Sequence, residues 1–343
     1  MADAREANRR RLRRLTEMDR HGAVGAASAG LKFQHTMHHG PGSIALRTRP
    51  FVEASTEGES TLSRLVLPRG VALRFYLLAI FDAQCRLAPG SSWANRRPLS
   101  GQRGCWSDFI AIDGAYDGRS RAYMPETKQI RDGGDLRVRQ IKSALTTLEG
   151  LGPSEALVTV PRDRIGRRLF QEFSLMKETG RGVHQTPDTY SVPTLGQPAE
   201  ATFTVPSDFF LNGWIQVLNP SEIATWLILQ YLSQWAADTH AYRGVYLYGR
   251  ARVNKFGIKR DAWEDGCQRL CSFGLIHPPH SSVLVPNSRK RYEPYRWQVD
   301  NQALHHDAME VCLRELTIRQ RDLERQAVQR SQPNIGPSDE ETH

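Results

Sequence analysis

The pattern of apolar and polar positions predicts two compact regions that resemble one another. In the second region apolar side chains fill residues 223–235, and in the first they fill residues 71–85; each run follows a proline, which favours the first turn of a helix. Further along, residues 259–273 place apolar side chains at steps of three or four, the spacing of one helix face. Residues 135–148 form the corresponding predicted helix. The chain is therefore expected to repeat one unit loosely, with an insertion around residues 88–121.

Composition between these runs predicts the domain boundaries. Residues 21–60 are rich in Gly, Ala, Ser and Thr and show little periodicity, which indicates a flexible segment after a basic, helical start. The fold class expected is α+β, mainly helical, with two tandem domains, a flexible N-terminal arm and a C-terminal helix. The predicted segments are the basic N-terminal arm with its flexible segment (1–60), the first domain (61–178), a linker (179–200), the second domain (201–300), the C-terminal helix (301–330) and a disordered acidic tail (331–343).

The clearest signal lies in the second domain. A short β-like run over residues 244–248 precedes residues 249–256, which fit one short helix. Gly257 and Ile258 predict a tight turn, and the next helix opens at Lys259. Two helices joined by a short turn that contains glycine form a helix-turn-helix.

Two further β-like runs follow the second helix, over residues 281–286 and 292–299, with a basic tip between them. This order of elements resembles the winged-helix DNA-binding superfamily over residues 217–298, and the first domain resembles it more weakly. Two such domains with a basic arm also resemble the tandem winged-helix initiators of plasmid replication. In that family one domain commonly mediates dimerisation while both can touch DNA, so the resemblance implies a homodimer.

The resemblance implies where DNA would be contacted. The second helix of a helix-turn-helix enters the major groove with its N-terminal residues at the base edges, which places Lys259 and Arg260 there. The other expected contacts, on phosphates or in the minor groove, are Arg250, Arg252 and Lys255 on the preceding helix; Arg289, Lys290 and Arg291 on the wing; Arg137, Arg139 and Lys142 on the helix of the first domain; and Arg162, Arg164, Arg167 and Arg168 on its hairpin. For each, the alternative is a solvated surface charge. Trp263 is expected to be a core anchor.

Charge supports a polyanionic partner without deciding the matter. The chain has 46 Lys and Arg against 37 Asp and Glu, a formal net charge of +9. No apolar run reaches the roughly 18 residues that a membrane span needs, and no secretory signal is visible. Five cysteines, an odd number, favour free thiols in a reducing cytoplasm over a disulfide framework.

Residues that suggest other chemistry have simpler interpretations. Cys267, Cys271, His277 and His280 resemble a metal set, but both cysteines share the apolar face of their helix, which favours core packing over zinc. The sequence has neither a phosphate-binding P-loop nor the nucleophile elbow of hydrolases. We therefore expect no enzymatic activity, no cofactor and no small-molecule substrate.

The sequence thus predicts a cytoplasmic protein that binds double-stranded DNA, as a replication initiator or a related DNA-organising protein. A transcriptional regulator is the first alternative. A winged-helix module for protein interaction is the second, and it would carry an acidic or neutral recognition helix. Either a dimerising coiled coil or packing onto the body suits the apolar stripe of the C-terminal helix, which is Met309, Leu313, Leu316, Leu323 and Ala327.

Overall fold

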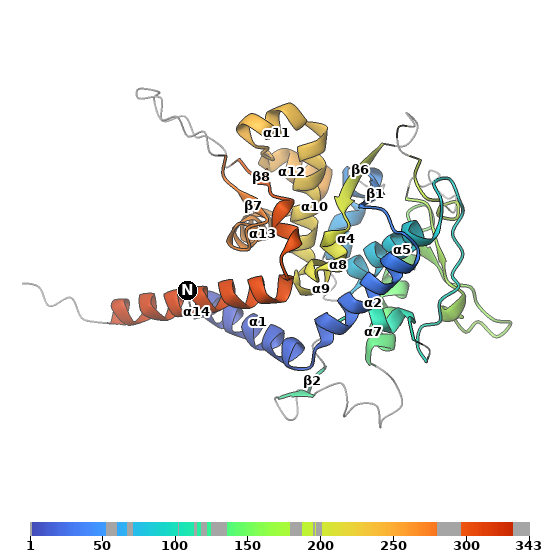
Figure 1. Ribbon diagram of the computed structural model, residues 1–343, viewed down its shortest axis with the longest axis horizontal. Helices are drawn as coiled ribbons and strands as arrows, with labels where there is room; N and C mark the ends of the chain where they lie inside the picture. The colour runs from blue at the N-terminus through green and yellow to red at the C-terminus, as the bar shows by residue number, and fades with distance from the viewer. Residues whose placement is uncertain are drawn as a thin grey trace, which may run out of the picture.

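The protein is mainly helical, with short antiparallel strands, as the sequence predicts (Figure 1). The computed structural model describes residues 2–52, 60–66, 71–101, 103–112, 115–117, 122–124, 136–178, 187–194, 196, 201–279 and 296–331.

The elements run in the following order. The α-helices are α1 (Ala2–Arg20), α2 (Ala23–Met37), α3 (Arg49–Val52), α4 (Thr61–Val66), α5 (Ala72–Arg86), α7 (Leu136–Glu149), α8 (Asp208–Leu211), α9 (Trp214–Val217), α10 (Pro220–Trp235), α11 (Ala237–Arg243), α12 (Gly249–Phe256), α13 (Arg260–Ser272) and α14 (Ala308–Ser331). The strands form four antiparallel pairs, which are β1 (Ser43–Arg47) with β6 (Thr202–Pro206), β2 (Ala115–Asp117) with β3 (Ala122–Met124), β4 (Val158–Thr159) with β5 (Ser174–Leu175), and β7 (Ile276–His277) with β8 (Gln298–Val299). Short 3-10 helices are η1 (Trp106–Phe109), η3 (Phe170–Glu172) and η4 (Gln302–His305).

Two helices, α5 and α10, form the centre of the core. Both are apolar nearly all round, so they are stable only when other elements cover every face. Phe75 to Phe81 of α5 and Ile223 to Leu229 of α10 are almost completely buried. α5 packs against α7, and α10 packs against α13. The predicted helices match α5, α7, α10, α12 and α13 closely.

The helix predicted at the start of the chain is present as α1, but the prediction of a flexible segment over residues 21–60 is wrong for its described residues, 21–52 and 60. α1 packs along α14, α2 packs against α8 and η1, and β1 pairs with β6 from Ser43 opposite Pro206 to Arg47 opposite Thr202. The buried face of α2 consists of Val24, Ala27, Ser28 and Leu31, which have the spacing of one helix face. Two of these four side chains are small, so the sequence shows little apolar periodicity although the face is fully packed.

The prediction of a linker over residues 179–200 is wrong for the part that the structure describes, residues 187–194. Tyr190 is fully buried, and its backbone N–H donates to Leu175 O at 2.8 Å. Ser191 forms a β-bridge with Ser92, within the predicted insertion, and its carbonyl accepts a hydrogen bond from Arg47. This segment therefore belongs to the core, and one continuous cluster of buried apolar residues extends through both predicted domains.

The C-terminal helix packs on the body over its first half. Ala308, Met309, Cys312 and Leu316 are buried where α14 contacts α1 and α9. Beyond residue 320 most described side chains of α14 are exposed. Of the two interpretations of its apolar stripe, packing onto the body holds for this first half.

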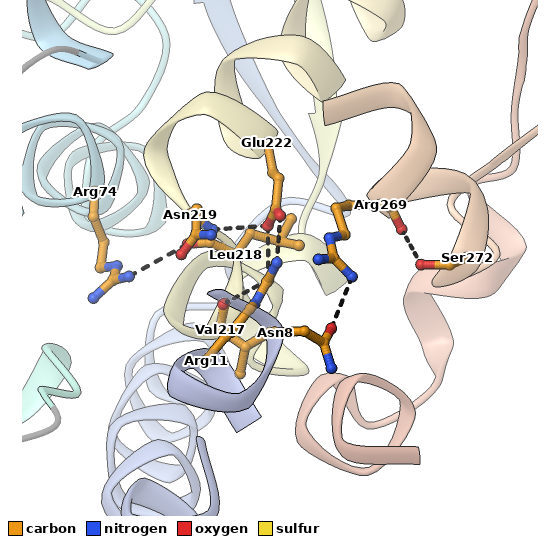
Figure 2. Close-up of polar contacts among 9 residues, drawn as sticks. All are labelled: Asn8, Arg11, Arg74, Val217, Leu218, Asn219, Glu222, Arg269 and Ser272. Atoms are coloured by element: carbon orange, nitrogen blue, oxygen red, sulfur yellow. Dashed lines mark hydrogen bonds and ion pairs between the residues drawn. The ribbon is translucent and has the colours of Figure 1, made fainter. Parts of the chain in front are cut away.

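A buried ion pair fixes α1 against the beginning of α10 (Figure 2). The guanidinium of Arg11 donates to both carboxylate oxygens of Glu222, one of them at 2.8 Å, and the two side chains are 8% and 4% exposed. Burial disfavours the charged guanidinium, but the charge and hydrogen bonds of Glu222 outweigh this effect and raise the pKa of Arg11. Glu222 also accepts a hydrogen bond from the N–H of Asn219, at the N-cap of α10, at 2.9 Å.

Asn8, one turn earlier on α1, extends the same contact to α13 and α14. Its amide nitrogen donates to Leu316 O at 3.0 Å and to Gln320 Oε1 at 3.1 Å, and its oxygen accepts from Arg269 Nη1 at 3.1 Å. Burial, with the nearby charges of Arg319 and Arg11, lowers the pKa of Arg269 to about 10. Arg269 remains a cation at neutral pH.

Replacement of Arg11 by methionine is expected to destabilise the protein by about 3–5 kcal/mol, because it leaves the Glu222 carboxylate buried without its partner. Chemical denaturation measures this loss. Arg9→Ala is the matched control: Arg9 forms an ion pair with Glu324 at 3.6 Å on the surface, with side chains 47% and 49% exposed, so its loss should cost less than about 1 kcal/mol.

The double variant Arg11→Met/Glu222→Gln should recover part of the stability, since it removes the unpaired charge and keeps an acceptor for Asn219. Equal stability of the Arg11→Met and Arg9→Ala variants would contradict the role assigned to the ion pair.

Candidate nucleic-acid interface

The turn between α12 and α13 requires glycine for two reasons. Gly257 has φ of 64°, and its N–H donates to Val253 O at 3.0 Å to close α12. A Cβ at Gly257 would also lie 2.5 Å from Ser63 Oγ on α4. Ser60, just before α4, donates to Phe256 O at 2.7 Å. The turn is thus docked on α4, and this docking sets where α13 begins.

The strands beside this helix pair meet on one central strand. Trp297 forms an antiparallel bridge with Val245, and the adjoining β8 pairs with β7. Residues 297–299 therefore lie between Val245, on the segment that leads into α12, and β7, the strand that follows α13. The predicted strand over 281–286 and the wing residues Arg289, Lys290 and Arg291 lie outside the described residues.

α13 buries one face and exposes a face of mixed charge. Trp263, Cys267 and Leu270 are buried on the side of α10, so Trp263 has the core role that the sequence predicts. The exposed charged residues of this helix and its N-cap are Lys259, Arg260, Asp261, Glu264 and Asp265. Three carboxylates thus accompany the two predicted cations, and Arg260 Nε donates to Glu264 Oε1 at 2.7 Å. Since these two side chains are 70% and 57% exposed, their pairing contributes little to stability.

The three predicted cations of α12 differ in their surroundings. Arg250 and Lys255 are exposed, as a phosphate contact requires. Arg252 is half-buried, and its Nε donates to Ile258 O at 3.1 Å across the turn. Its first role is therefore to hold the turn between α12 and α13.

The first predicted domain presents a more uniformly basic surface on α7 and the β4–β5 hairpin. Arg139 and Lys142 are exposed on α7, Arg137 is half-buried, and Lys142 Nζ lies 5.8 Å from the centre of the Phe170 ring. Arg162, Arg164 and Arg167 are exposed on the hairpin tip. The carboxylate within α7 is Glu149, and Arg168 neutralises it at 2.9 Å.

Arg168 therefore differs from the other predicted DNA contacts. Its second nitrogen donates to Thr146 Oγ1 at 3.2 Å, so its guanidinium ties the hairpin to the end of α7.

The two candidate DNA-binding helices, α13 and α7, lie apart in the molecule: α13 is on the left of Figure 1 and α7 on the right.

One surface that the sequence analysis did not single out lies over α10, α11 and α12. Trp235 and Tyr248 border a hollow of about 400 Å³ and are 74% and 63% exposed, and Tyr242 nearby is 77% exposed. Tyr248 belongs to the run interpreted as a strand, where alternate aromatic residues are ordinary. The sequence of such a run therefore does not show that one of its aromatic side chains is exposed beside a hollow.

The residues that resemble a metal set differ in their surroundings where they are described. Cys267 is buried, and burial raises the pKa of its thiol well above the usual range. His277 Nδ1 lies 3.0 Å from Pro278 O, and His280 is outside the described residues. In the described part of the chain, no three His, Cys, Asp or Glu side chains are grouped as metal ligands. All five cysteines are free thiols.

Comparison with known proteins finds no matching family model, curated protein or solved structure. Among the helices of the described ranges, none combines the length and apolar character of a membrane span.

The close approach of α13 to α10 generates a second prediction. A Cβ at Gly266 would lie 2.6 Å from Thr225 Oγ1 and 3.1 Å from Thr225 Cβ. Thr225 is fully buried, so it has little room to yield. Gly266→Ala should therefore destabilise the protein by about 1–2 kcal/mol despite the better helix propensity of alanine, as thermal or chemical denaturation would measure.

Gly25→Ala is the matched control, because Gly25 lies in α2 and its added Cβ would meet nothing within 4 Å. That variant should be neutral or slightly stabilising. The double variant Thr225→Ala/Gly266→Ala should regain stability relative to Gly266→Ala alone. Additive losses in the double variant would argue that α13 and α10 do not approach in this way.

Proposed function

We propose that this protein binds double-stranded DNA through two helix-and-hairpin units. The order α10, Val245 bridge, α12, turn, α13, β7 and β8, with Trp297 bridged to Val245 and β8 paired with β7, agrees with a winged helix. In the first unit, α5, α7 and the β4–β5 hairpin follow in the order of α10, α13 and the β7–β8 pair, and α5 packs on α7; the residues described between α5 and α7 include no counterpart of α12. The proposal rests on this arrangement together with the distribution of charge.

The basic surface of α7 and its hairpin carries the proposal. Its cations are exposed on α7 and on the hairpin. Of the carboxylates described there, Glu149 is neutralised by Arg168, Asp163 is engaged by the turn, and Glu172 is exposed. Arg139, Lys142, Arg162, Arg164 and Arg167 suit the spaced phosphates of a duplex, where each contact releases a bound counterion. Contacts of this kind supply affinity and register but no sequence information.

Sequence reading belongs to α13 in this proposal. Lys259 and Arg260 at its N-terminus can donate to guanine in the major groove, whereas Asp261 and Glu264 can accept from the amino group of cytosine. Arg250 and Lys255 on α12 would hold phosphates beside it. A helix of mixed charge is thus compatible with base recognition if other elements supply most of the phosphate contacts.

The biological role that we propose is initiation of replication or a related organisation of DNA, with the protein acting as a homodimer. Two DNA-binding units at separate places in the molecule suit a site with repeated elements near an origin. A palindromic site at a promoter would instead favour a transcriptional regulator.

One observation favours a second candidate function, recognition of a protein partner through α13. Its exposed face carries Asp261, Glu264 and Asp265 against two cations, which is close to the neutral or acidic helix expected of an interaction module. In that case α13 would bind a surface of complementary charge and contribute nothing to DNA affinity.

Binding to random duplex DNA across a salt series separates these functions. Arg139→Ala/Lys142→Ala should lower the slope of log affinity against log salt by about two, because two phosphate contacts are lost. Lys259→Ala/Arg260→Ala should mainly weaken the preference for sites selected from a random pool. Fluorescence anisotropy measures both effects.

The matched control is Arg321→Ala/Arg325→Ala, which removes two exposed cations from the far end of α14. An equal loss in all three double variants would mean that only net charge drives binding, and DNA would then not be the specific partner. A selected site that is insensitive to the α13 variant would favour the second candidate function.

A further inference from the structure

The tip of the β4–β5 hairpin presents an isoleucine to solvent within a group of arginines. Ile165 is 70% exposed, and Arg162, Arg164 and Arg167 around it are exposed as well. A single exposed apolar residue on a protein surface is ordinary and needs no explanation. Ile165 differs because its backbone is fixed and three exposed cations surround it.

The turn that carries Ile165 is held by Asp163. Asp163 Oδ1 accepts hydrogen bonds from the N–H groups of Ile165 and Arg167, at 3.0 and 2.8 Å. The N–H of Asp163 donates to Arg167 O at 2.9 Å, and Gly166 adopts φ of 82° to complete the turn. The one acidic side chain in the described tip therefore serves the turn, and Ile165 is presented with little conformational freedom left to lose on binding.

The root of the hairpin is equally fixed. Arg168 binds Glu149 and Thr146 on α7, and the other oxygen of Glu149 accepts a hydrogen bond from Val160 N at 3.0 Å. The hairpin and the basic face of α7 therefore form one rigid unit. Wherever α7 is placed on a duplex, the position of Ile165 follows.

We propose that Ile165 is an apolar wedge that enters the minor groove and partly unstacks one base step, while Arg164 and Arg167 hold the phosphates that border the groove. This inference rests on the proposed binding of duplex DNA and names the form of DNA recognised. Apolar side chains inserted between base pairs kink a duplex, and pyrimidine–purine steps such as TpA open most readily. The wedge would therefore add a preference for a flexible step that no hydrogen bond reads.

The test uses the full chain and a duplex of about 30 base pairs with 2-aminopurine beside a single TpA step. Binding of the wild type should increase the 2-aminopurine fluorescence, because the base loses its stacked neighbour. The wild type should also bind this duplex about tenfold more tightly than one with an A-tract at the same place. Ile165→Ala should abolish both effects and leave the salt dependence of binding intact.

Two variants serve as controls. Ile165→Met keeps an apolar wedge and should retain the fluorescence increase, and Ile318→Ala removes another isoleucine, 46% exposed on α14, and should change nothing. Salt-sensitive binding by the wild type without a fluorescence increase would overturn the wedge and leave DNA binding standing. Absence of DNA binding by the wild type would overturn both proposals. Retention of the fluorescence increase in Ile165→Ala would overturn the wedge alone, and point to a protein contact for this tip.

Discussion

The arrangement of the molecule depends on the buried contact between Arg11 and Glu222. Two charges removed from water are tolerated only when each satisfies the other, so this pair admits one relative position of α1 and α10 (Figure 2). Through Asn8 the same contact reaches Arg269 on α13 and the backbone of α14. The N-terminal helix is thereby part of the framework that positions α13, although it lies far from α13 in sequence.

The two candidate DNA-binding units differ in the charges that they expose, and each pattern suits the contact proposed for that unit. On α7 and its hairpin, cations are exposed and the nearby carboxylates Glu149 and Asp163 are engaged in internal contacts. On α13, two cations at the N-terminus are followed by three carboxylates on the exposed surface. A uniformly basic surface holds any polyanion with similar strength, whereas a face of mixed donors and acceptors can discriminate between partners. The net charge of +9 conceals this difference, because it sums over both.

Local signals in the sequence predicted the elements that local physics determines. The proline and Glu222 at the start of α10, and Gly257 after α12, mark helix boundaries by capping and by backbone conformation, so α10, α12 and α13 lie where they were expected. The apolar face of α13 was predicted by its period. The carboxylates of its exposed face, Asp261, Glu264 and Asp265, are visible in the sequence as well.

Contacts between distant residues were beyond prediction. β1 and β6 pair across more than 150 residues, and Arg11 finds Glu222 over a separation of 211 positions. Arg11 has no feature that distinguishes it from the arginines around it, and the capping position of Glu222 does not reveal its partner. The packed face of α2 escaped for another reason, because alanine and serine fill it and contribute almost nothing to apolar periodicity.

The packing of α1 on α14 joins residues 2–20 to residues 308–331, and this bears on synthesis in the cell. A ribosome adds residues one after another, so Asn8 and Arg11 leave the exit tunnel long before Gln320 or Glu222 exists to receive them. Until then the hydrogen-bonding side chains of α1, Asn8 and Arg11, lack their final partners. The packing of α1 against α10 and α14 can therefore form only after residue 320 has been synthesised.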